Sequence, residues 1–183
     1  MDISKLTLSD KIIAGSGILL FIASFLTWFS ASSSVSGGGD LTDLGIDPAD
    51  FSGSLGSVNG WDVGFLWAGL PALLGLIAAA AVLLPKLSEV KLPELPIPWG
   101  QAFLGAGALA ALLVILKLLI GEDGGGSETF SGVTVKVDID RGIGIFLATL
   151  ASLGLAYGGY LKFAGKEDDG GTATPPPPGA APF

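Results

Sequence analysis

The chain has 183 residues, of which 50% are apolar and 14% charged, and it carries a net charge of −8 with no Cys and no His. Without Cys and His it lacks thiol nucleophiles, disulfides, imidazole bases and the usual protein ligands of zinc and haem. The negative charge argues against nucleic-acid binding, because phosphate contacts need clustered Lys and Arg. Nucleophile–base pairs, phosphate loops and dinucleotide motifs are also missing, so we expect no catalytic residues, no cofactor and no enzyme activity.

Four long apolar runs dominate the chain, at about 12–30, 63–84, 99–120 and 143–163. Each is close to the roughly 20 residues that a helix needs to cross ~30 Å of hydrocarbon. Inside a bilayer, a helix also satisfies its own backbone hydrogen bonds. The sequence therefore predicts an all-α membrane protein with a four-transmembrane-helix bundle over residues 1–165. Alternatively, the first run is a signal peptide cleaved near Ser30-Ala31-Ser32, although its apolar core is longer than such peptides have.

Basic residues favour one orientation of these helices. Lys136 and Arg141 fall in the segment 121–142, and 31–62 has no basic residue, whereas six lysines lie on the other side of the runs: Lys5, Lys11, Lys86, Lys91, Lys162 and Lys166. The positive-inside rule therefore places both termini in the cytoplasm and makes 31–62 and 121–142 outer loops. We expect a multi-pass protein of the plasma membrane.

The outer loops contain signals of β-structure. Four β-branched residues alternate with polar ones in the second loop, at Val133, Val135, Val137 and Ile139. This period of two is typical of a half-buried strand. Because a lone strand is unstable, it needs a partner in the first loop, at 51–58 or 32–36. We expect a small extracellular β element formed by the two outer loops.

Acidic residues of the first outer loop allow two interpretations. Asp47-Pro48-Ala49-Asp50 is typical of the start of a short helix. Together with Asp40 and Asp43, these aspartates suggest a calcium site, but their spacing does not fit the EF-hand pattern. A solvated acidic surface is the preferred interpretation, and we expect no metal.

Small residues recur every four positions in three of the runs, at Gly64, Ala68 and Ala72, at Ala102, Ala106 and Ala110, and at Gly144, Ala148, Ser152 and Ala156. Such stripes let helix backbones approach closely. They predict packing within the bundle or, alternatively, a face for a partner protein. The second and fourth runs also align at an offset of eighty residues, and the first and third at ninety, with Gly17 on Gly107. This alignment suggests two helical hairpins of the same orientation.

Lys117 is a candidate functional charge, because ionisable residues inside a span are costly. It lies near the outer end of the third run, so its ammonium can reach the headgroups. Otherwise it pairs with an outer carboxylate or with a partner subunit.

Residues 166–183 differ in composition from the rest of the chain. Charged and Gly residues are followed by a proline run at Pro175–Pro178. This composition predicts a disordered, Pro-rich cytoplasmic tail, either simply solvated or docking in an aromatic groove of a partner.

Three segments carry a resemblance to known proteins: Ser9-Asp10-Lys11, Phe25-Leu26-Thr27-Trp28-Phe29-Ser30 and Asn59-Gly60-Trp61-Asp62. Over most of the chain except the tail, the sequence resembles small uncharacterised four-span membrane proteins of actinobacteria. The resemblance implies topology and a location in the cell envelope, and it supplies no catalytic or ligand residues. The plan is also similar to that of claudins, although the paired Cys of their first outer loop is missing.

An elaborated outer face without reactive residues favours a non-enzymatic role. We expect an interaction, scaffold or accessory subunit of the cell envelope or of a membrane complex. Its expected partners are the lipid bilayer and other membrane or envelope proteins, or further copies of the chain. The alternative is a small channel, carrier or lipid-handling protein.

Overall fold

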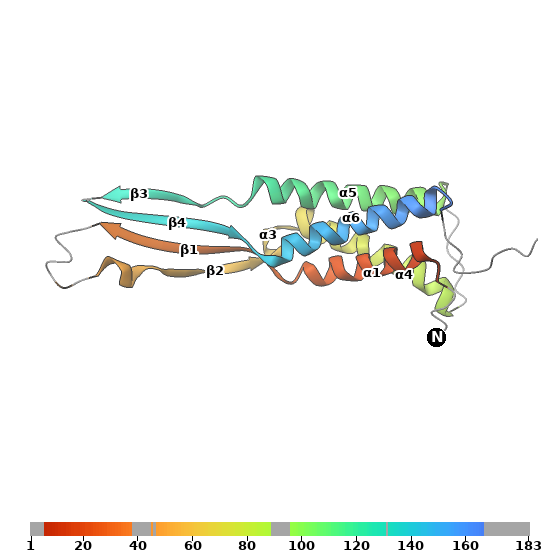
Figure 1. Cartoon of the computed structure of the whole chain (residues 1–183), viewed down its shortest axis with the longest axis horizontal. Helices are drawn as coiled ribbons and strands as arrows, with labels where there is room; N and C mark the ends of the chain where they lie inside the picture. The colour runs from red at the N-terminus through yellow and green to blue at the C-terminus, as the bar shows by residue number, and fades with distance from the viewer. Residues whose placement is uncertain (1–5, 38–44, 46, 89–95, 131, 167–183) are drawn as a thin grey trace, which may run out of the picture.

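The computed structural model describes residues 6–37, 45, 47–88, 96–130 and 132–166. The predicted tail from residue 167 onward lies outside the described residues, as do Lys5, Lys91 and the candidate calcium ligands Asp40 and Asp43. The helices lie together at one end of the molecule, and the strands extend from them at the other end (Figure 1).

Helices and strands are interleaved along the chain. In sequence order they are α1 (Leu8–Ala23), β1 (Thr27–Gly37), the 3-10 helix η2 (Pro48–Phe51), β2 (Gly53–Asn59), α3 (Gly60–Val63), the π-helix η3 (Phe65–Gly69), α4 (Leu70–Ser88), α5 (Trp99–Ile120), β3 (Gly126–Phe130), β4 (Val133–Arg141) and α6 (Ile143–Phe163). The short helix predicted after Asp47 is thus present as η2.

The prediction of an all-α, four-span protein is wrong. A four-stranded antiparallel sheet accompanies the helices. In the described part of the chain, three helices are long and apolar enough to cross a membrane, at Phe65–Lys86, Trp99–Ile120 and Ile143–Phe163. Helix α1 has 16 residues and measures about 24 Å, which falls short of ~30 Å of hydrocarbon.

The error at α1 has a physical cause. The apolar run continues past the end of the helix at Ala23 into Trp28 and Phe29, which are buried side chains of β1. Hydropathy cannot show where a buried helix gives way to a buried strand.

The second apolar run also differs from a single plain helix. Gly64, with φ of +124°, separates α3 from η3, and α4 follows directly. Pro85 lies inside α4, which continues to Ser88 instead of ending at the proline.

The sheet has the strand order β2-β1-β4-β3. The strand predicted from the alternating residues is confirmed as β4, and of its two predicted partners it pairs with 32–36, which belong to β1. Residues opposite each other in antiparallel strands point to the same side. One face therefore carries the pairs Ala31–Ile139, Ser33–Val137 and Val35–Val135, and the other carries Ser30–Asp140, Ser32–Asp138, Ser34–Lys136 and Ser36–Thr134.

The two halves of the chain repeat one order of elements. The first half runs α1, β1, β2, α4, and the second runs α5, β3, β4, α6. Helix α1 packs against α4 and α6, and α5 packs against α6 and α4. The helices thus follow one another as α4, α1, α6, α5, and the strands that continue them have the same order, β2-β1-β4-β3.

Equivalent glycines lie where two helices pack closely in each half. A side chain at Gly17 would collide with the backbone of Gly75 in α4. A side chain at Gly107, the position ninety residues later, would collide with the backbone of Leu155 and Ala156 in α6. These contacts agree with the predicted pair of hairpins.

Candidate functional site

The sheet meets the helices at two buried aromatic residues of β1, Trp28 and Phe29. Trp28 Nε1 donates a hydrogen bond to the Ala23 carbonyl at 2.9 Å. The backbone N–H of Gly142, between β4 and α6, donates to the Trp28 carbonyl at 2.7 Å, and that of Gly60 donates to the Ser24 carbonyl at 2.9 Å. The base of β1 is therefore held by the segments that enter α3 and α6.

Lys117 lies at this junction and is only 8% exposed. Its Nζ is 2.7 Å from Oε2 of Glu122, and it stands 5.6 Å and 5.9 Å from the ring centroids of Phe29 and Trp67. Of the alternatives predicted for Lys117, the structure shows pairing with an outer carboxylate. Beside it, Nε of Arg141 donates to the Leu118 carbonyl at 2.8 Å and so satisfies the end of α5.

The side of the sheet that carries the valines of β4 is called the apolar face. Pairing with Val133 places Phe130 on it, and Leu55 shares a cavity with Ala31 and Ile139 of the same face. This cavity of about 320 Å³ lies at the base of the sheet and is also lined by Glu122. The apolar side chains of this face are Ala31, Val35, Leu55, Phe130, Val133, Val135, Val137 and Ile139, and the same register places Ser33 and Glu128 among them.

Much of the apolar face is open to solvent. Phe130 is 84% exposed, Leu55 60% and Val135 42%. The two edge strands, β2 and β3, each pair with a neighbour on one side only. The outer side of such a strand presents backbone groups to which another chain can bind.

The other side of the sheet, called the polar face, is formed by serines of β1 and by Thr134, Lys136, Asp138 and Asp140 of β4. Lys136 Nζ is 2.6 Å from Oδ1 of Asp138, and both side chains are largely exposed. Such a surface is stable in water and needs no partner. The two faces therefore differ sharply in chemistry.

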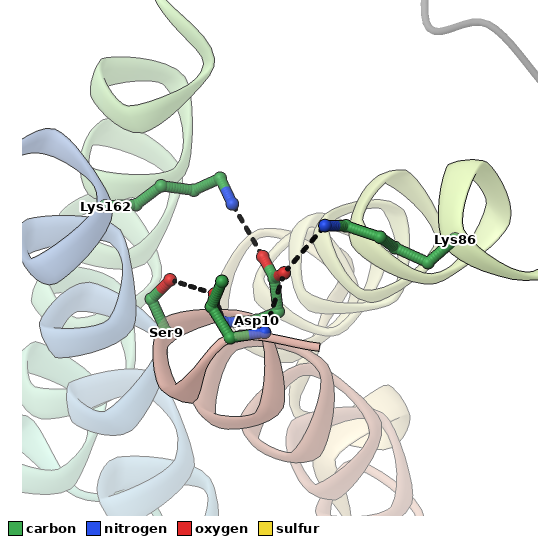
Figure 2. A network of polar contacts seen from close by, with 5 residues as sticks. Ser9, Asp10, Lys86 and Lys162 are labelled. Carbon is green, nitrogen blue, oxygen red and sulfur yellow. Dashed lines mark hydrogen bonds and ion pairs between the residues drawn. The ribbon is translucent and has the colours of Figure 1, made fainter. Parts of the chain in front are cut away.

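A second polar cluster lies at the opposite end of the helices, around Asp10 (Figure 2). Asp10 is 1% exposed. Lys162 Nζ of α6 is 2.6 Å from Asp10 Oδ1, and Lys86 Nζ of α4 is 3.7 Å from Oδ2. Figure 2 shows the two lysines reaching the carboxylate from separate helices. This Asp10 network, made of Asp10, Lys86 and Lys162, joins α1, α4 and α6.

The first turn of α1 also holds the carboxylate of Asp10. Its backbone N–H donates to Thr7 Oγ1, and the Thr7 N–H donates to Oδ2 of Asp10, each at 3.3 Å, which is a capping box. Burial raises the pKa of Asp10, but the hydrogen bond and charge of Lys162 and the hydrogen bonds of Thr7 outweigh it. The net result is a pKa below the ordinary value of 3.8.

Sequence reasoning missed Asp10 as a site residue. A detectable signal was the spacing of Thr7 and Asp10, which suits a capping box. The lysine partners are distant in sequence, so no local pattern indicates them.

The predicted small-residue stripes lie mostly inside the protein. Those with buried side chains or backbones are Ala68, Ala72, Ala110, Gly144, Ala148 and Ser152. Gly64, Ala102, Ala106 and Ala156 are half-buried. In α5 the face that contacts α6 includes Gly107, which the stripe of Ala102 and Ala106 did not contain.

Among the described residues, no three Asp or Glu side chains are grouped so that they could hold a metal ion. Comparison with protein-family models, with curated proteins and with solved structures finds no match to this chain. The resemblance to actinobacterial four-span proteins therefore stays a prediction.

Proposed function

We propose that this chain is a non-enzymatic membrane protein that binds a partner protein through the apolar face of its sheet. One observation carries the proposal: apolar side chains on one face of the projecting sheet are exposed, Phe130 to 84%, Leu55 to 60% and Val135 to 42%. Exposed apolar surface on one face of a protein is typical of interaction sites.

The helices supply the membrane anchor in this proposal. Three of them are long and apolar enough to cross a bilayer. Among the basic residues that the structure describes, four lie toward the end of the Asp10 network, Lys11, Lys86, Lys162 and Lys166, and three lie at the sheet or its base, Lys117, Lys136 and Arg141. By the positive-inside rule, the end of the Asp10 network faces the cytoplasm of a cell and the sheet stands outside the plasma membrane. The start of α1, beside Lys86, then lies on the cytoplasmic side with the end of α6.

The two faces of the sheet suggest how the partner docks. The polar face, with its serines and carboxylates, is already solvated. Covering the apolar face lowers the free energy by roughly 25 cal/mol for each Å² of apolar surface removed from water. A partner segment covering this face can also form backbone hydrogen bonds with an edge strand, β2 or β3.

The proposal is tested by site-specific photo-crosslinking in native membranes. A photoreactive side chain replaces Val135 on the apolar face, and Thr134, its neighbour on the polar face, serves as the matched control position. We expect Val135 to give one defined adduct with a partner protein, or with a second copy of the chain, and Thr134 to give none. Equal adducts at both positions, or none at either together with a single monomeric species in mild detergent, would contradict the proposal.

A further inference from the structure

A second cavity, of about 160 Å³, lies at the end of the helices away from the sheet. Its walls include the aromatic rings of Trp99 and Phe103 from α5 and the ring of Pro85 from α4. Its rim carries the three charged residues of the Asp10 network, Asp10, Lys86 and Lys162. An apolar space bordered by two ammonium groups suits an amphiphile with an anionic head.

The geometry of the rim separates the roles of the two lysines. Lys162 Nζ makes a short contact of 2.6 Å with Asp10, and this contact fixes the ends of α1 and α6. Lys86 Nζ stands 3.7 Å from the same carboxylate, beyond hydrogen-bond distance, and its side chain is 40% exposed. Because 40% of the Lys86 side chain is exposed, an anion can approach it while Lys86 stays paired with Asp10.

The position along the helices is that of lipid headgroups. Lys86 and Lys162 lie in the last turns of α4 and α6, two of the three helices able to span a bilayer. Helix α5 begins beside them at Trp99 without a side-chain cap, and the positive end of its dipole favours negative charge there. Trp at this depth is also typical of a membrane interface.

We propose that this cavity binds the phosphate head of an anionic lipid, with the phosphate on Lys86 and Lys162 and the first acyl methylenes against Trp99, Phe103 and Pro85. Basic pockets between helices on the cytoplasmic side are known places for such headgroups. The inference depends on the three helices lying in a membrane, and it is independent of any partner of the sheet. A phosphate group could also arrive as free inorganic phosphate, so the test separates the two sources.

The test uses the full chain in neutral detergent, titrated with phosphatidylglycerol or phosphatidylcholine of the same acyl chains and observed by native mass spectrometry. We expect a Kd for phosphatidylglycerol at least about tenfold lower, which corresponds to ~1.4 kcal/mol. Lys86→Gln should remove most of this preference, because one of the two ammonium groups that hold the phosphate is lost. The Lys162–Asp10 contact stays in place, so we expect the fold to be kept. Lys136→Gln, at the sheet, is the matched control and should keep the preference.

Three outcomes would overturn the inference. The first is equal affinity for the two lipids. The second is an unchanged preference in Lys86→Gln when its circular dichroism equals that of the wild type. The third is displacement of phosphatidylglycerol by millimolar inorganic phosphate, which would assign the site to the free anion. The photo-crosslinking at Val135 tests only partner binding by the sheet. The proposed lipid site and the proposed partner site can therefore each be refuted independently of the other.

Discussion

At the scale of single residues, we expect Asp10 to stabilise the fold through its contacts with Thr7 and Lys162. Asp10→Asn keeps one acceptor oxygen but directs an NH2 group toward a lysine ammonium. Since hydrogen bonds to charged groups contribute about 1.5–3 kcal/mol, we expect a loss of about 2 kcal/mol, read as a lower Tm in mild detergent. Asp140→Asn, an exposed carboxylate on the polar face, is the control and should change stability by less than about 0.5 kcal/mol.

The same substitution has a defined dependence on pH. The pKa of Asp10 is lowered in the folded protein from 3.8, so the contact stabilises the fold fully above that value and is lost as pH falls through the folded pKa. The difference in stability between wild type and Asp10→Asn should therefore be constant near neutral pH and shrink below about pH 4. A difference that grew on acidification would contradict the assignment of a charged Asp10.

Lys117 gives a second prediction about a single charge. Lys117→Met keeps the apolar stem, and Glu122, whose side chain is 35% exposed, can then be hydrated. In a double-mutant cycle with Glu122→Gln, we expect a coupling of about 1 kcal/mol between the two residues, measured by unfolding in detergent. A coupling near zero would show that the 2.7 Å contact does not hold α5 to the loop that follows it.

At the scale of elements, the contact of α5 with α6 depends on Gly107. A methyl group there would meet the backbone of Ala156 and Leu155, which cannot rotate away. We expect Gly107→Ala to destabilise the protein by about 1–3 kcal/mol, the usual cost of overpacking. Gly105→Ala, on the same helix with open space around it, is the control and should be neutral or stabilising. Equal Tm values for the two variants would contradict this packing.

Some elements could be predicted because their signals are local. The alternation from Val133 to Ile139 was sufficient to place β4, and an Asp-Pro pair was sufficient to place η2. The apolar runs from 99 and from 143 correspond closely to α5 and α6. Each of these elements has a signal within its own residues: alternation in β4, an Asp-Pro start in η2, and an apolar run of about 20 residues in α5 and α6.

Other features depended on tertiary contacts that no local pattern reveals. The serines from Ser30 to Ser36 carry no strand pattern of their own, and 32–36 was only one of two expected partners of the predicted strand. They form a central strand because β2 and β4 pair with β1 on its two sides. The transition from α1 to β1 occurs within one continuous apolar run. The Asp10 network needs Lys86 and Lys162, which only the folded chain brings to Asp10.

At the scale of the whole molecule, the proposed orientation can be tested directly, since the chain has no native Cys. Ser34→Cys places a thiol on the sheet, and Lys11→Cys places one at an exposed position of α1 near the other end. In intact cells, a membrane-impermeant maleimide should label the first variant within minutes and the second only after permeabilisation. Labelling of the second variant alone in intact cells would invert the orientation.

The way strands continue helices has a mechanical consequence. Only Gly142 separates β4 from α6, and its N–H is bonded to the carbonyl of Trp28 at the base of β1. Because no flexible linker separates β4 from α6, a sideways force on the far end of the sheet exerts a torque on α6 and α1. Those two helices meet again at Asp10 and Lys162, so a force on the sheet would strain that contact at the opposite end of the helices.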